Sequence, residues 1–157
     1  MTDLTRKRQR MRDQFLGQLI ILIVQFLLGT AVNLFVTITR DHPGANPPEY
    51  FSGVVQSVTW ATLHGPVLLI LHSIVGLLLV LNAFGLLIRA IRMRTRNLIT
   101  VTAFGSFGIL AAGFNGGSFL SYNEDFSSLL MASFFAIAVV AYTVGLYVTE
   151  RPASVSA

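Results

Sequence analysis

The sequence predicts an all-α membrane protein, a four-transmembrane-helix bundle with a short interfacial helix between its first two spans. Of the 157 residues, 54% are hydrophobic and only 11% are charged, whereas roughly a quarter of the residues of an ordinary soluble domain are charged. The apolar residues also gather in long runs that are separated by short polar segments. A soluble fold of this length could not bury so much apolar surface, so lipid is expected to cover it.

The first span is expected from Phe15 to Thr39, because a helix needs about 20 apolar residues to cross the hydrocarbon core. Three prolines and a glycine make residues 41–50 a loop. Pro66 divides the next apolar stretch, since proline suits the first turn of a helix and not its interior. This division predicts a short helix over residues 49–63 and a second span over residues 65–91. The alternative is one long helix that is kinked at Pro66.

Two further apolar runs predict spans over residues 98–120 and 127–148. The chain therefore divides into a basic N-terminal segment (1–14), a four-helix transmembrane domain (15–149) and a short tail (150–157). The interfacial helix is expected to bury Phe51, Val54, Val55 and Val58 and to place Trp60 at the level of the headgroups.

The charges predict the orientation. Ten of the eleven basic residues lie in residues 6–12, in residues 89–96 and at Arg151. The segments that face the other side hold Asp41, Glu49, Glu124 and Asp125, with Arg40 as their one basic residue. The positive-inside rule then predicts a multi-pass protein of the cell (inner) membrane with both termini in the cytoplasm. The basic residues are typical of topology signals and anionic-lipid contacts, so nucleic acid is not expected as a partner.

Polar side chains within the spans are expected to face the bundle interior, because lipid solvates them poorly. On the first span, this stripe comprises Gln18, Gln25, Gly29 and Asn33. On the third span, Gly105, Gly108, Ala112 and Gly116 form a line of small residues that lets another helix approach closely. Asn115 lies among densely spaced glycines, which predict a loosened or broken helix end.

His72 is the most informative residue of the second span. It shares a helical face with Gly65 and Gly76, which would leave room for a flat group beside the imidazole. Over this one turn, the histidine with a glycine nearby resembles four-helix membrane b-type cytochromes. The resemblance implies haem b with His72 as an axial ligand. Such cytochromes take their two ligands from different helices, so the second would be Met131, an open position or His72 of a second protomer. The alternatives for His72 are a hydrogen-bonded structural histidine, a quinone site or a proton relay.

The expected cofactor site lies in the outer half of the bundle. Its residues are His72, Gly65, Gly76, Met131, Asn115 and Asn33. His64 is a further candidate metal ligand, because the outer loops could bring it near His42 and the acidic residues. A surface position is the alternative for His64.

Three functions follow from these residues. The first is a cofactor-binding protein, with haem b or quinone, that takes part in electron transfer. The second is a non-catalytic accessory subunit or scaffold of a membrane complex. Whatever its function, the chain is expected to be a homo-oligomer or a subunit of a membrane complex. The third is an oligomeric channel for a small solute, lined by Gln18, Gln25, Asn33 and Asn82. Nucleotide-binding loops, zinc-protease motifs and nucleophile elbows do not occur in the sequence, which therefore does not indicate an enzyme.

Overall fold

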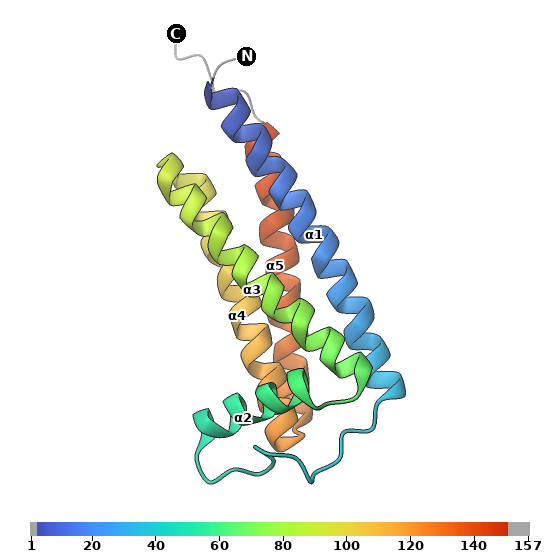
Figure 1. The fold of residues 1–157 in the computed structure, drawn as a ribbon. Helices are drawn as coiled ribbons and strands as arrows, with labels where there is room; N and C mark the ends of the chain where they lie inside the picture. Colours follow the sequence, from blue (N-terminus) through green and yellow to red (C-terminus); the bar gives the residue numbers. More distant parts are fainter. Residues whose placement is uncertain (1–2, 151–157) are drawn as a thin grey trace.

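Four long helices pack side by side, and a short fifth helix lies across one end of them (Figure 1). This computed structural model describes residues 3–150, with the side chains from Thr5 onward. The predicted tail 150–157 falls outside the described residues except for Glu150. The elements are α1 (Asp3–Phe35), α2 (Tyr50–Leu63), α3 (Val67–Met93), α4 (Arg96–Tyr122) and α5 (Asp125–Glu150). The predicted fold class is confirmed.

Each of the four long helices is long and apolar enough to cross a membrane. The shortest, α5, has 26 residues, which at 1.5 Å per residue extend about 39 Å, against a hydrocarbon core of about 30 Å. Only 17 to 33% of the most apolar 18-residue window of each helix is buried in the protein. The remaining apolar side chains need a nonaqueous solvent, so this is a multi-pass membrane protein whose helices contact the lipid bilayer.

The beginning of α1 and the end of α5 lie at the same end of the bundle. Arg12 of α1 forms an ion pair with Glu150 of α5, with 2.5 Å between Nη2 and Oε1. One turn deeper, the ring of Phe15 packs against Gly145. The described chain therefore crosses the bundle an even number of times.

The first span differs from its prediction at both ends. It begins at Asp3, twelve residues before Phe15, and stops at Phe35, four residues before Thr39. The early start is explained by Met11 and Phe15, which are both fully buried and so continue the helix into the basic segment. The early stop coincides with the β-branched run at 36–39, whose residues have lower helix propensity.

Helix α2 is separate from α3, so the single kinked helix does not form. Its N-terminus is capped by Glu49, whose carboxylate accepts the backbone N–H groups of Phe51 and Ser52 at 3.0 and 2.6 Å. These two hydrogen bonds hold the pKa of the Glu49 carboxyl below its usual value, and the bond from Ser52 has the larger effect. His64 ends the helix, and Pro66 immediately precedes α3.

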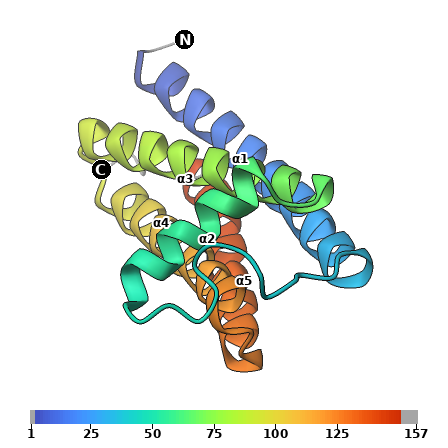
Figure 2. The same cartoon turned by 60° about the horizontal axis from the view of Figure 1, so that its bottom comes forward.

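The buried face of α2 is not the predicted one. Small residues contribute most of it, namely Gly53, Ser57 and Ala61 together with Val54. Of the predicted stripe, only Val54 is buried within the protein and Val58 is half-buried, whereas Phe51 and Val55 are 66 and 65% exposed and do not pack into the bundle. Helix α2 packs on α3 and α4 (Figure 2). Its small residues also let the preceding loop approach closely, because a Cβ atom on Gly53 would collide with the ring of Pro47.

Helices α4 and α5 share the most extensive contact in the described bundle. A Cβ atom on Gly108 would lie 2.8 Å from the carbonyl oxygen of Phe134 and 2.9 Å from the amide nitrogen of Ala138. Gly105 lies equally close to the ring of Tyr142. The predicted line of small residues therefore does what its spacing indicates and lets α5 approach the backbone of α4.

The predicted break in α4 does not occur. The helix runs without interruption through the glycine-rich segment to Tyr122. Gly117 packs against Val54 and Val58 of α2, and Gly116 packs against Met131 of α5. The packing of neighbouring helices compensates for the low helix propensity of glycine here.

Candidate functional site

The polar side chains of the spans meet in two layers between α1 and α3. The layer nearer α2, which we call the outer layer, consists of Gln25 and His72, with 3.2 Å between Nε2 of the amide and Nε2 of the imidazole. The ring of His72 also lies directly on Gly29, where a Cβ atom would be 3.0 Å from Cε1. Gly29 thus provides the space that the imidazole occupies, and the two helices approach closely at this level.

Two atoms of the outer layer are buried without a hydrogen-bond partner among the described residues, Oε1 of Gln25 and Nδ1 of His72. If the Gln25 amide donates to Nε2 of the ring, the ring proton resides on Nδ1. The layer then retains one unused acceptor and one unused donor. Such a pair can hydrogen-bond a small polar group, but only after the surrounding side chains move, because both atoms are covered by protein.

Gly76 and Gly65 do not provide the clearance that their spacing predicted. A Cβ atom on Gly76 would lie 3.2 Å from Nε2 of Gln25, so the glutamine side chain fills the space next to this glycine. Gly65 precedes the first residue of α3 and packs against Ala61 and Leu69. The helical line from Gly65 to His72 therefore breaks at Pro66.

Asn33 does not join the polar layers, because it is exposed. The step from Gln18 to Gln25 is seven residues, which returns to nearly the same helical face. A further seven residues lead to Val32, which is buried, whereas Asn33 is rotated by about 100° from Val32. The assignment of Asn33 to the inward stripe was wrong for this reason.

Met131 and Asn115 have their contacts in α4 and α5 rather than at His72. The sulfur of Met131 lies 3.2 Å from the position of a Cβ on Gly116. The amide of Asn115 donates to the carbonyl of Ala111 in its own helix at 2.8 Å. The structure brings together Gln25, Gly29, His72 and Gly76, and it leaves the other predicted lining residues apart from them.

The inner layer is formed by Gln18, which is fully buried. Its amide nitrogen donates to the carbonyl of Leu79 at 3.2 Å, and its amide oxygen accepts a 2.6 Å hydrogen bond from Asn82. Close by, the hydroxyl of Ser106 donates to the carbonyl of Ala83 at 3.2 Å. Tyr142 of α5 is fully buried at this level with its ring on Gly105, and its hydroxyl has no hydrogen-bond partner among the described residues.

Sequence reasoning identified the glutamines and Asn82 as interior residues but missed Ser106. A serine in an apolar span is a weak signal, because it can bond to its own helix as readily as to another one.

His64 is exposed at the end of α2. It lines a shallow surface hollow of about 240 Å³, together with Trp60, Thr59, Gln56, Val55 and Pro43. His42 is buried instead and stacks on Trp60, with 4.3 Å between the ring centroids. Within residues 5–150, no group of three or more histidine, aspartate or glutamate side chains could hold a metal ion, so the outer loops do not assemble the metal site considered for His64.

A set of hydrogen bonds that the sequence did not reveal closes the outer end of the bundle. Arg40 donates to the carbonyls of Leu120 and Ser121 at 3.3 and 2.9 Å, at the end of α4. The hydroxyls of Ser57 and Ser121 are 3.0 Å apart, and Tyr50 bonds to Ser118. These bonds attach the loop after α1 and the helix α2 to α4, and they satisfy helix-terminal carbonyls. We call residues 40–61 and 118–122 together the outer cap.

Comparisons with protein families, with curated proteins and with solved structures find no match for this chain. The functional argument therefore depends on the two polar layers and on the surfaces of the bundle.

Proposed function

We propose that the protein is a non-catalytic accessory subunit or scaffold of the cell membrane, which works as part of a larger membrane assembly. The observation that supports this most directly is the bond between Gln25 and His72 across α1 and α3. The intramembrane histidine is engaged by a neighbouring helix, and the second polar layer engages Gln18 and Asn82 in the same way. Polar residues used in this manner hold helices together.

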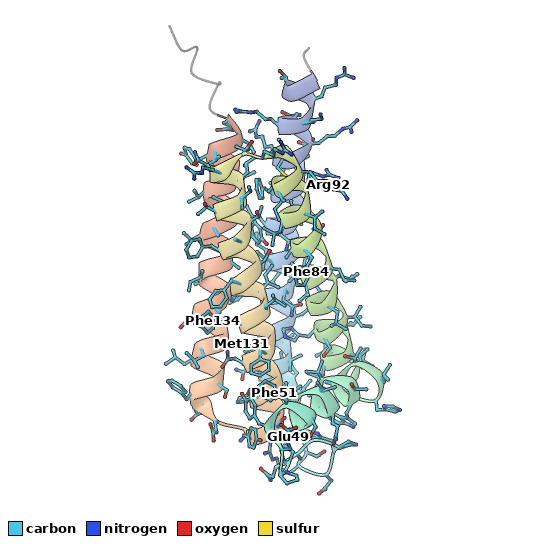
Figure 3. All side chains as sticks on the ribbon, turned by 90° about the vertical axis from the view of Figure 1, so that its left-hand side faces the viewer. Glu49, Phe51, Phe84, Arg92, Met131 and Phe134 are labelled. Carbon is cyan, nitrogen blue, oxygen red and sulfur yellow. The ribbon has the colours of Figure 1, made fainter. Side chains whose placement is uncertain are left out.

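The proposed orientation has both termini in the cytoplasm. Segments 1–14, 89–96 and 150–157 hold ten basic residues against three acidic ones, whereas segments 36–66 and 121–126 hold one basic residue against four acidic ones. The labelled Arg92 and Glu49 lie toward opposite ends of the molecule (Figure 3). The positive-inside rule supports placing the basic end on the cytoplasmic side.

Binding of a cofactor for electron transfer is a second candidate function, which the unpartnered Oε1 of Gln25 and Nδ1 of His72 favour. A quinone carbonyl or hydroxyl would suit these atoms better than haem b would. Axial ligation of a haem by Nε2 of His72 requires Gln25 to leave that atom and to vacate the space beside Gly76. A quinone could bind by hydrogen bonds after a smaller movement of the same amide.

One purification separates the two candidates. The full chain is extracted in a mild detergent, its absorbance is recorded across the Soret region, and an organic extract is analysed for quinones. For a scaffold, we expect no Soret band, no stoichiometric quinone and a native complex larger than the chain alone. A Soret band or bound quinone that His72→Leu removes while the variant stays folded would overturn the scaffold proposal.

The matched variant is His72→Gln, which retains a hydrogen-bonding group. A structural histidine predicts that His72→Leu lowers the free energy of unfolding by about 1 kcal/mol and that His72→Gln restores most of that loss. A ligand-binding histidine predicts equal loss of the ligand in both variants.

A further inference from the structure

The turn between α3 and α4 holds a concentration of unpaired positive charge. Arg89, Arg92, Arg94 and Arg96 are all exposed, and no carboxylate of the described chain forms an ion pair with any of them. Arg12 at the same end differs, because Glu150 neutralises it. The four guanidinium groups of the turn are therefore free to bind an external anion.

The backbone keeps these arginines close together. Helix α3 ends at Met93, Arg94 adopts a left-handed conformation with φ of 52°, and α4 begins at Arg96. The four side chains consequently start from two adjoining helix ends rather than from distant parts of the surface. Guanidinium groups bind phosphate oxygens through paired hydrogen bonds, which a cluster of this kind can supply from several directions.

The turn also lies where the lipid-facing surface ends. Ile88 and Ile91 are 49 and 52% exposed, so the apolar surface of α3 continues to the residue before Arg92. The basic residues of α1 are placed differently. Arg6 and Arg10 precede Leu16, the first exposed apolar residue after them, by ten and six residues, or about 15 and 9 Å along the helix. The arginines of the turn are thus nearer to the headgroups.

We propose that the α3–α4 turn is a binding site for the phosphate group of an anionic phospholipid. The lipid's acyl chains lie along the exposed isoleucines, and its phosphate contacts Arg92 and Arg96, with Arg89 and Arg94 beside them. The opposite end, where the carboxylates predominate, has no comparable surface. This site does not depend on whether the bundle is a scaffold or binds a cofactor.

The test is a titration of the purified full chain with phosphatidylglycerol in detergent, with bound lipid counted by native mass spectrometry. The variant Arg92→Gln/Arg96→Gln is compared with Arg6→Gln/Arg10→Gln, which removes the same charge from α1. Each arginine near a lipid surface contributes enough that the turn variant is expected to bind about 30-fold more weakly. The α1 variant is expected to lose less than about threefold, because its arginines lie about 15 and 9 Å along α1 before the first exposed apolar residue, where salt screens them more strongly.

Parallel titrations use phosphatidylcholine and inorganic phosphate, and circular dichroism verifies that both variants remain helical. The proposal predicts much weaker binding of phosphatidylcholine and little competition by inorganic phosphate, because the apolar contacts add to the affinity. Equal losses in the two variants would show a diffuse field rather than a site and would overturn the proposal. Full displacement by inorganic phosphate would overturn the assignment to lipid.

Discussion

Two helix interfaces of the bundle are built by different chemistry. Between α4 and α5, Gly105 and Gly108 allow close contact, and a Cβ on Gly108 would meet the backbone of the partner helix at 2.8 Å. Between α1 and α3, the defining contacts are polar, with Gln18 bonded to Asn82 and Gln25 to His72. Close van der Waals packing and interhelical hydrogen bonds are the two main means of helix association in lipid, where the hydrophobic effect between spans is weak.

The two interfaces should respond differently to substitution. A packed interface has no room, so an added side chain must move a whole helix. A polar interface retains its shape when one partner is removed, and the cost is that of leaving the other partner unpaired. A single added side chain at the α4–α5 interface should therefore lower the stability of the bundle greatly. Each hydrogen bond lost between α1 and α3 should lower it by a smaller amount.

Gly108→Leu should have the largest effect. The new side chain collides with the backbone of α5 at Phe134 and Ala138, and we expect the free energy of unfolding to fall by about 3 kcal/mol or more. The measurement is a denaturant titration of the chain in mixed micelles, followed by circular dichroism.

Gly113→Leu is the matched control, because a Cβ at Gly113 meets nothing within 4 Å. It should leave stability unchanged or raise it slightly, since leucine favours helix more than glycine does. Equal destabilisation by both substitutions would refute the close-packed description of the α4–α5 interface.

Gln18→Leu should have an intermediate effect. The substitution leaves Asn82 without its 2.6 Å acceptor, and the expected loss is about 1 to 2 kcal/mol. Asn82→Leu removes the same bond from the other side, so the double variant should lose clearly less than the two single losses added together. A double-mutant cycle measures this coupling, and additive losses would contradict a bonded pair.

Glu49→Gln should have the smallest effect and should leave both interfaces intact. The Glu49 carboxylate accepts two N–H groups at the start of α2 and its pKa is lowered from 4.5. Because the folded-state pKa lies below the unfolded one, the stabilisation is present above the unfolded value. It is lost as the pH falls through the folded-state pKa.

The measurement for this prediction is the amide proton shift of Phe51 and Ser52 by NMR during an acid titration. Both shifts should follow the protonation of Glu49 in the native chain. They should be nearly constant in Glu49→Gln over the same range, and a midpoint above 4.5 in the native chain would contradict the capping bonds.

The membrane spans could be predicted from the sequence because each is a long apolar run, and lipid imposes the helical conformation on it. The interior position of Gln18, Gln25 and His72 followed from the cost of placing polar groups in lipid. Partner identity did not follow, because helix spacing indicates a face but not the neighbour that covers it. Asn33 shows how small an error in helical position changes such a prediction, because its immediate neighbour Val32 is buried whereas Asn33 is exposed.

The outer cap lay beyond such reasoning. From the sequence, Arg40 was only the one basic residue of the acidic segments, yet it bonds to carbonyls that lie 80 and 81 residues later in the chain. Contacts of this kind depend on which ends of the bundle meet, and hydropathy carries no information about that. The buried face of α2 could not be predicted for a related reason. Its small residues fit against the preceding loop and α4, and neither contact can be read from hydropathy.

The bonds from Arg40 also constrain the order in which the molecule can be completed. Leu120 and Ser121 emerge from the ribosome long after residues 40–61, so the loop and α2 can pack on them only after α4 has been inserted into the membrane. Until then Arg40 and Ser57 lack the partners that they have in the complete structure. The outer cap therefore forms only after the end of α4 has been made. A chain truncated before residue 118 would keep its first two spans but would lack the groups of α4 to which Arg40 and Ser57 bond.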